Sequence, residues 1–197
     1  MAYGFSPEER QRIRSALRAE ARACAVSPGM RKTTVETLTQ RVGISKGAFY
    51  LFYPSKELLF LEVLEDLHSL VYGRMAEEVR CHPELSPDER TAQAVLAACE
   101  ALEASGMLPF WENDVPALLQ RLPTESLRES YHADGVHIRE ALQPLTQDEE
   151  QLALASAAVE ALMLTLSHRR QIGPLYPQVL RLMASGMFRA MFTTEEA

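Results

Sequence analysis

The stretch TTVETLTQRVGISKGAFYLFYPSK, residues 33–56, has the pattern of two short helices joined by a tight turn. Gly43 stands at the turn, where the chain needs a residue that bends without a Cβ penalty. Ser45 is expected to cap the second helix. That helix has only about two turns, and a helix so short is unstable alone in water. The pattern therefore predicts a helix-turn-helix module, in which a scaffold presents a short helix to the major groove of DNA.

Caps and apolar residues within this stretch support both helices. Thr33 or Thr34 is expected to cap the first helix, and Glu36 follows Thr33 at the spacing of a capping box. The apolar residues predict a shared face on which the two helices pack together: Val35, Leu38, Val42, Ile44, Phe49 and Tyr53.

The same region resembles the DNA-binding region of the TetR (tetracycline-repressor-like) family. The runs that match in order and spacing are Thr33-Thr34-Val35-Glu36, Gly43-Ile44-Ser45-Lys46-Gly47, Phe49-Tyr50 and Ser55-Lys56-Glu57. The resemblance covers about the first third of the chain. It implies a one-component transcription regulator, with a helix-turn-helix DNA-binding domain at residues 1–55 and a helical ligand-binding and dimerisation domain at residues 56–197.

Charge is distributed unevenly along the 197 residues, whose formal net charge is -7. Residues 1–56 hold ten Lys or Arg residues against four acidic ones, whereas the remainder holds ten basic and 23 acidic residues. A basic end on an acidic chain suggests that this end meets a polyanion. The acidic remainder is repelled by DNA and orients the molecule with its basic end foremost.

Helix signals recur along the rest of the chain, and no strand alternation accompanies them. Ser6-Pro7-Glu8-Glu9 and Ser86-Pro87-Asp88-Glu89 each read as a helix start, with Ser at the N-cap and Pro after it. We expect an all-α protein of about nine helices. The later elements are a long helix from Ser55 to about Arg80, a region broken by Pro109, Pro116 and Pro123, and helices over about 125–142, 149–170 and 176–192.

The helix-turn-helix reading names the residues that would touch DNA. The N-terminus of the second helix would expose Ser45, Lys46, Gly47 and Ala48 to the groove. Thr33 or Thr34 would bind phosphate at the start of the first helix. The family resemblance implies that Tyr50 contacts DNA and that Lys56 binds phosphate, while Phe52 replaces a polar residue common in the family. The hydroxyl of Tyr53 is a further candidate for a phosphate contact.

Four arginines recur at every fourth position of the first helix and line one face of it: Arg10, Arg14, Arg18 and Arg22. Like charges at this spacing repel one another mildly. The stripe therefore either meets a compensating anion such as phosphate or is an ordinary solvated face.

Composition of the last two long helices predicts a homodimer interface. Residues 152–166 are apolar nearly all round and rich in small side chains, which permit close approach of another helix. A short recognition helix contacts few base pairs, so useful specificity needs two helix-turn-helix domains on a symmetric site. The expected interface residues are Ala155, Ala158, Val159, Leu162, Leu166, Val179, Met183 and Met187.

A small-molecule effector is implied by the family resemblance, and its pocket is expected among aromatic, flexible apolar and a few polar side chains. The candidates are His68, Tyr72, Met75, Met107, Phe110, Trp111, Tyr131, His132 and Met163. Each of them is also an ordinary core residue by type. Binding of the effector is expected to release a repressor from a pseudo-palindromic operator.

Two alternatives remain open at this stage. Glu129 and His132 have the spacing of half a dimetal site in a helical bundle, although no second half is present, so an enzyme is disfavoured. The second alternative keeps the DNA-binding domain but replaces the small molecule with a protein partner or a thiol-redox signal at Cys24, Cys81 or Cys99. We expect no cofactor and no metal.

The cysteines and the hydropathy pattern indicate a cytoplasmic protein. The three cysteines are odd in number and follow no metal-binding spacing, and the N-terminus has no secretory signal. The most apolar run, residues 152–166, is interrupted by Glu160 and is expected to be too short to span a bilayer.

Overall fold

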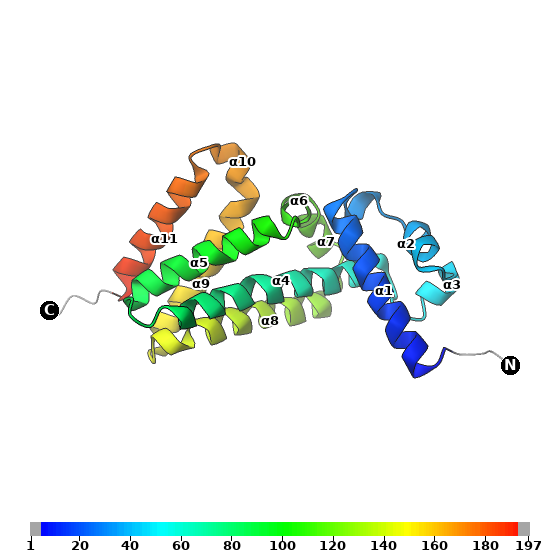
Figure 1. The fold of residues 1–197 in the computed structure, drawn as a ribbon, viewed down its shortest axis with the longest axis horizontal. Helices are drawn as coiled ribbons and strands as arrows, with labels where there is room; N and C mark the ends of the chain where they lie inside the picture. Colours follow the sequence, from blue (N-terminus) through cyan, green and yellow to red (C-terminus); the bar gives the residue numbers. More distant parts are fainter. Residues whose placement is uncertain (1–4, 193–197) are drawn as a thin grey trace. The chain divides into compact units, whose positions relative to one another are not determined.

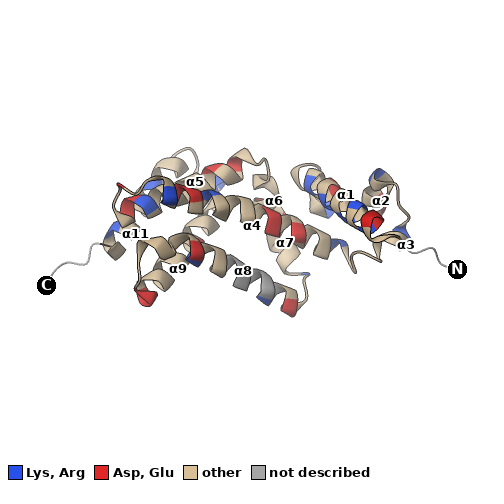
Figure 2. Cartoon of the chain, turned by 60° about the horizontal axis from the view of Figure 1, so that its bottom comes forward, with Lys and Arg blue, Asp and Glu red and all other residues tan. Residues whose placement is uncertain are grey.

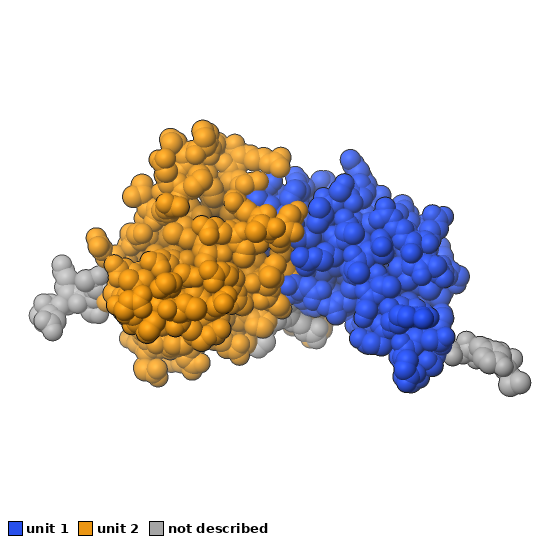
Figure 3. Space-filling model, in the orientation of Figure 1, with its two compact units in different colours: residues 1–66, 107–123 blue, residues 67–106, 124–197 orange. Residues whose placement is uncertain are grey.

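The computed structural model describes the backbone of residues 5–192, with side chains over this range except at residue 127 and residues 129–134. The described range is all-α, as predicted: it contains eleven α-helices, three short 3-10 helices and no strand. The helices form two compact units (Figure 3). Unit 1 comprises Met1–Asp66 and Met107–Pro123, and unit 2 comprises Leu67–Gly106 and Thr124–Ala197.

Unit 1 contains the predicted helix-turn-helix and a second, later segment of the chain (Figure 1). Its elements are α1 (Pro7–Val26), η1 (Met30–Lys32), α2 (Val35–Val42), α3 (Lys46–Phe49), the first part of α4 (Lys56–Cys81), α6 (Leu108–Asn113) and α7 (Val115–Leu119). The inclusion of α6 and α7 was not expected from the sequence. The division at residues 55 and 56 therefore stays a proposal about function, separate from these compact units.

The start of α1 has the capping box that the sequence predicts. Ser6 Oγ accepts a hydrogen bond from the backbone N–H of Glu9 at 3.2 Å, and the Glu9 carboxylate accepts one from the Ser6 N–H at 2.9 Å. The helix buries a stripe of small and apolar residues at helical spacing: Ile13, Leu17, Ala21, Cys24 and Ala25. This stripe forms one wall of the unit 1 core.

The turn between α2 and α3 is formed by Gly43, whose φ of 76° lies in the left-handed region that favours glycine. Ser45 caps α3 by accepting a hydrogen bond from the N–H of Ala48 at 3.1 Å, as predicted. Leu38 of α2 and Phe49 of α3 are fully buried. Burial of these two side chains stabilises a helix pair too short to persist alone.

Unit 2 is built from the remainder of α4 and the later helices. Its other elements are α5 (Pro87–Ala104), α8 (Thr124–Leu142), η2 (Gln143–Leu145), α9 (Glu149–Thr165), η3 (Leu166–His168), α10 (Arg169–Ile172) and α11 (Tyr176–Phe192). Helix α5 packs against α11 and α9, and α8 packs against α9. Small residues of α5 such as Ala94 and Ala98 are fully buried, which allows the neighbouring helices to approach closely.

The long helix expected to reach about residue 170 is shorter than predicted. Helix α9 ends at Thr165 and continues as a 3-10 turn and the short α10. The Thr165 hydroxyl donates to the carbonyl of Leu162 at 2.6 Å and shares a hydrogen bond of 2.9 Å with the Tyr176 hydroxyl. Ser167 Oγ likewise donates to the carbonyl of Leu164 at 2.7 Å. Such side-chain bonds to the backbone compete with regular helix, which explains the change.

The apolar segment around α9 is longer than the sequence run suggested. Residues Glu149–Ile172 form one helical stretch that is long and apolar enough to cross a membrane by length and composition alone. The core helix of a soluble protein passes the same criterion, so this is weak evidence for a membrane span. Leu152, Val159 and Leu162 of this stretch are buried within the protein.

Candidate nucleic-acid interface

The N-terminus of α3 presents the residues that the sequence assigned to DNA contact. Ser45, Lys46 and Gly47 are exposed, and Ala48 is half-buried. An added Cβ at Gly47 would meet only Ser45 Oγ, at 3.9 Å. The fold itself therefore has room for a side chain at this position, and the packing of the protein does not require the glycine.

Lys46 is not a free cation in this structure. Its ammonium donates a hydrogen bond to the carboxylate of Glu36, which joins α3 to α2 across the turn. This bond lowers the pKa of Glu36 and raises the pKa of Lys46, so both groups stay charged at neutral pH. Both side chains are more than half exposed, so Lys46 can exchange this partner for a phosphate or a base edge at little cost.

Tyr50 and Tyr53, which lie close together in the sequence, have different environments. Tyr50 is 49% exposed and packs its ring edge-on against Phe49, with 5.4 Å between ring centroids. Tyr53 is only 3% exposed, and its hydroxyl donates to Glu62 at 2.7 Å. Burial and this hydrogen bond raise the pKa of Tyr53. The structure thus leaves Tyr50 available to DNA, whereas the Tyr53 hydroxyl suggested for a phosphate contact is bound to Glu62.

The two threonines before α2 also have separate roles. Thr34 is exposed and caps α2 by accepting from the N–H of Thr37 at 3.1 Å. Thr33 is buried, and its hydroxyl donates to the carbonyl of Gly29 at 2.8 Å. The capping box of Thr33 with Glu36 is therefore not formed, and a phosphate contact by the Thr33 hydroxyl is not supported. The exposed Thr34 and the N-terminus of α2 remain available.

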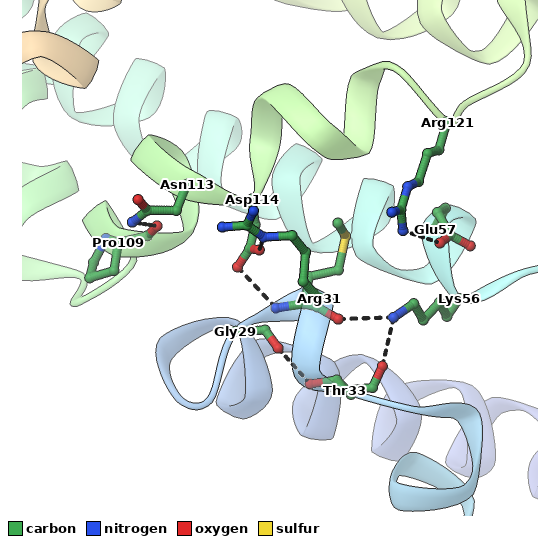
Figure 4. A network of polar contacts seen from close by, with 10 residues as sticks. Gly29, Arg31, Thr33, Lys56, Glu57, Pro109, Asn113, Asp114 and Arg121 are labelled. Atoms are coloured by element: carbon green, nitrogen blue, oxygen red, sulfur yellow. Dashed lines mark hydrogen bonds and ion pairs between the residues drawn. The ribbon is translucent and has the colours of Figure 1, made fainter.

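Lys56 begins α4 and points back to the segment before α2. Its Nζ donates to the carbonyl of Thr33 at 2.7 Å and to the carbonyl of Met30 at 3.0 Å (Figure 4). An ammonium has three donors, so one is left for a phosphate. Lys56 therefore holds the backbone at the α2 N-terminus in addition to the phosphate role that the family resemblance implies.

Two arginines of the stripe on α1 form ion pairs with carboxylates of the protein itself. Arg14 donates to Glu62 of α4, and Arg18 donates to Asp66 while its Nε lies 3.6 Å from Glu62. These carboxylates raise the pKa of both guanidinium groups. The compensating anion that was one of the two readings of the stripe is thus a carboxylate of the protein at Arg14 and Arg18. Figure 2 colours Lys and Arg blue and Asp and Glu red along the chain.

Arg10 contacts an aromatic ring. Its guanidinium lies 5.6 Å from the ring centroid of Phe52, and the ring of Phe5 lies 5.7 Å from the same centroid. The departure from the family pattern at Phe52 thus replaces a polar group by a ring that packs on the start of α1.

Comparison with known proteins finds a family model that matches the helix-turn-helix region. Residues 17–63 match the family model described as bacterial regulatory proteins, tetR family. The matched residues span most of α1, the whole helix-turn-helix and the start of α4. No curated protein matches this chain closely enough to count as a relative.

Solved structures share the fold at low sequence identity. A protein of Streptomyces coelicolor A3(2), assigned as a transcriptional regulator, is 17% identical with a TM-score of 0.69, over 92% of this chain and 99% of the other. A TetR transcriptional regulator from Rhodococcus sp. RHA1 is 14% identical with a TM-score of 0.62, over 96% and 100%. FadR of Thermus thermophilus, a TetR-family repressor in complex with lauroyl-CoA, is 22% identical with a TM-score of 0.61, over 95% and 97%.

The candidate pocket residues are divided between the two units. Unit 2 contains His68 and Tyr72, whose rings lie 5.6 Å apart, together with Met75 and Met163. Met107, Phe110 and the half-buried Trp111 belong to unit 1, where Phe110 packs on Phe60 at 6.0 Å. The side chains of Tyr131 and His132, and of Glu129 in the alternative metal site, lie outside the described residues. Among the side chains described, no cluster of three or more His, Cys, Asp or Glu residues has metal-binding geometry.

Most of the predicted dimer residues face the interior of the chain. Five of them are buried within unit 2: Ala155, Ala158, Val159, Leu162 and Leu166. Val179, Met183 and Met187 are half-buried. Composition identified the two helices, but it did not distinguish their core side from their outer side. The outer side of α9 and α11 carries Leu154, Ala157, Ala161, Leu164, Leu182 and Gly186.

Sequence reasoning missed two carboxylates that organise unit 1. Glu62 accepts from Arg14 and Tyr53, and Asp114 accepts from the backbone of η1. Glu62 lies at a helical position beside apolar residues, which is a weak signal of a buried partner. The sequence offers no such signal for Asp114, because its partners lie more than 80 residues away.

Proposed function

We propose that this chain is a tetR-family protein: a homodimeric, cytoplasmic transcription repressor that binds a pseudo-palindromic DNA operator and is released by a small molecule. The observation that carries the DNA-binding part is the end of α3, where the exposed Ser45, Lys46 and Gly47 stand beside the exposed Tyr50. Phe49 anchors this helix in the core, so the exposed residues are held in place. We infer that they read the major groove while Thr34 and Lys56 bind phosphates.

The outer sides of α9 and α11 support dimerisation. Leu164 is 65% exposed and Leu182 is 74% exposed, and small residues such as Ala157 and Gly186 are exposed on the same helices. Apolar and small side chains on two long helices are typical of a surface that another helix pair covers. We propose that this surface replaces the set of interface residues expected from the sequence.

The proposed effector is a small molecule with an apolar part. FadR of Thermus thermophilus holds lauroyl-CoA on a similar fold, but its identity to this chain is only 22%. Buried aromatic and flexible apolar side chains of unit 2, among them His68, Tyr72 and Met75, suit an effector with an apolar part. Lauroyl-CoA is therefore a reasonable first probe, and free lauric acid and coenzyme A test which part of it matters.

A thiol-redox signal is a weaker alternative. Cys24 and Cys99 are buried and only Cys81 is exposed. Burial and the nearby Glu103 and Glu100 raise the pKa of Cys99 to about 12, which suppresses its reactive thiolate. Operator affinity that is equal with and without reductant would agree with this assignment, and a large difference would favour the redox alternative.

Selection of bound duplexes from random DNA tests the proposal. The selected sequences should contain an inverted repeat, and two chains should bind each duplex. Leu164→Glu together with Leu182→Glu should yield a monomer. This monomer should bind the selected duplex at least about tenfold more weakly, because a single helix-turn-helix domain makes few contacts with DNA. Leu70→Glu, at another exposed leucine, is the matched control and should leave both properties unchanged. A double variant that remains dimeric would refute the proposed interface.

A further inference from the structure

Asp114 connects the later segment of unit 1 to the backbone before α2. It lies between α6 and α7, and only 5% of its surface is exposed. Its Oδ2 accepts a hydrogen bond from the backbone N–H of Met30 at 2.9 Å, and its Oδ1 accepts one from Arg31 Nε at 3.2 Å (Figure 4). A carboxylate so deeply buried is costly without partners, and both of these partners belong to η1.

Gly29 makes this contact possible. Its φ of 100° lies in the region that favours glycine, and an added Cβ would lie 2.9 Å from Asp114 Oδ2. Any larger residue would therefore push the carboxylate away from Met30 or strain the backbone. The chain is thus adapted at this glycine to bring the carboxylate close to η1.

The opposite side of η1 is held by Lys56. Its ammonium binds the carbonyls of Met30 and Thr33, while Asp114 binds the N–H of Met30. Thr33 directly precedes Thr34, the residue that caps α2. The position of the α2 N-terminus, where a phosphate is proposed to bind, therefore depends on a carboxylate from one side and an ammonium from the other.

The segment that carries Asp114 also contacts the start of α4. Arg121 lies 3.6 Å from Glu57 (Figure 4). Phe110 packs on Phe60 of the same helix, with 6.0 Å between ring centroids. In the sequence, this segment is bounded by α5 and α8, which belong to unit 2. A conformational change in α5 or α8 of unit 2 can therefore shift the segment that carries Asp114. This gives unit 2 a second connection to unit 1, in addition to α4.

We propose that Asp114 is a positioning residue for DNA binding, through which the α6–α7 segment (residues 108–119) sets the position of η1 and the N-terminus of α2. A shift of this segment changes operator affinity by releasing or restoring the contact between Asp114 and Met30. The inference rests on the DNA-binding function proposed above. Asp114 itself does not touch DNA.

Three variants test this role on the full-length protein, with a duplex selected by the wild-type protein as the probe. Asp114→Ala removes both acceptors, and Asp114→Asn keeps one carbonyl oxygen for the Met30 N–H. Asn113→Ala is the matched control, because Asn113 is a neighbour of Asp114 whose amide donates to the carbonyl of Pro109 within α6. Fluorescence anisotropy measures operator affinity, and amide hydrogen exchange measures local opening at residues 30–37 and in α5.

Asp114→Ala should weaken operator binding by at least about fivefold, the lower end of typical coupling between sites. Amide exchange should be faster at residues 30–37 and unchanged in α5. Asp114→Asn should be intermediate. Asn113→Ala should stay within about twofold of the wild type, because Asp114 rather than Asn113 accepts the hydrogen bonds from η1. If Asp114→Ala does not fold, a weaker affinity of Asp114→Asn with the same local pattern of exchange supports the inference.

Wild-type affinity of Asp114→Ala, or of Asp114→Asn where only that variant folds, would overturn the inference. So would a loss of affinity in which exchange accelerates equally in α5, since this would indicate a general loss of stability. These results are distinct from failure of the proposed function, in which the wild-type protein itself would bind no duplex.

Discussion

The hydroxyl of Tyr53 donates a hydrogen bond of 2.7 Å to the Glu62 carboxylate, and Arg14 of α1 binds the same carboxylate. The guanidinium of Arg14 also lies 5.5 Å from the ring centroid of Tyr53. Glu62 is mostly buried. These three side chains join α1, the end of the helix-turn-helix and α4 within unit 1, so the support of the helix-turn-helix is partly ionic.

Replacing each tyrosine by phenylalanine should separate support from DNA contact. Tyr53→Phe loses one hydrogen bond to a carboxylate and should lower the free energy of unfolding by about 1–2 kcal/mol, with DNA affinity nearly unchanged. Tyr50→Phe should weaken DNA binding with little effect on stability, because its hydroxyl is proposed to contact the duplex. Urea unfolding and fluorescence anisotropy measure the two effects. Weaker DNA binding by Tyr53→Phe together with lower stability of Tyr50→Phe would contradict both assignments.

Glu36→Gln should strengthen DNA binding. The substitution releases the Lys46 ammonium from its partner on α2 and removes one negative charge from the proposed interface. We expect affinity to increase by roughly threefold or more at low salt, because like charges across an interface oppose association. Glu84→Gln, a change at another exposed acid, is the control and should leave affinity unchanged. Weaker binding by Glu36→Gln would indicate that the pair positions Lys46 for DNA.

Gly47→Ala should stabilise the protein and weaken its DNA binding. An added Cβ meets no close atom, and alanine favours helix over glycine by about 0.5–1 kcal/mol. On our account the Cβ would instead meet the DNA. Gly73→Ala in α4, where there is also open space, should stabilise the protein by a similar amount without changing affinity. Wild-type affinity of Gly47→Ala would mean that this backbone does not approach the duplex closely.

Alkaline pH should destabilise the protein partly through Cys99. An unfolded thiol with an ordinary pKa of 9.0 loses its proton before the folded one, whose pKa is raised to about 12 by burial. Between these values the folded state binds more protons, so the free energy of unfolding falls as pH rises, by at most about 1.4 kcal/mol per pH unit from this group. Urea unfolding at pH 8, 9 and 10 measures the slope. Cys99→Ala should make the decline shallower, and an unchanged decline would contradict the assignment.

Local features of the chain were predictable, because they depend on residues close in sequence. Gly43 and Ser45 act in the α2–α3 turn as expected, and the helix over Tyr176–Phe192 has the predicted bounds. Thr34 rather than Thr33 caps α2, since the Thr33 hydroxyl is bound to Gly29. A choice between adjacent caps depends on tertiary contacts that a local pattern does not contain.

Contacts between distant residues account for most of what the sequence did not predict. The partners of Asp114 lie 84 and 83 residues away, and the pairing of Arg14 with Glu62 spans 48 residues. The arginine stripe was recognised, but its anion was not, because phosphate and a carboxylate on another helix satisfy the same charge. The sequence likewise did not indicate which side of α9 is exposed, because this helix is apolar nearly all round.

DNA binding by a dimer is the central claim, and titration of a selected duplex at several salt concentrations tests it most directly. We predict two chains per duplex. The logarithm of the binding constant should fall linearly with the logarithm of the salt concentration. A dimer that makes about 6–10 phosphate contacts should lose roughly 10³–10⁵ in affinity between 50 and 200 mM salt. A monomeric protein that selects no duplex, or a complex whose affinity does not change with salt, would contradict the account.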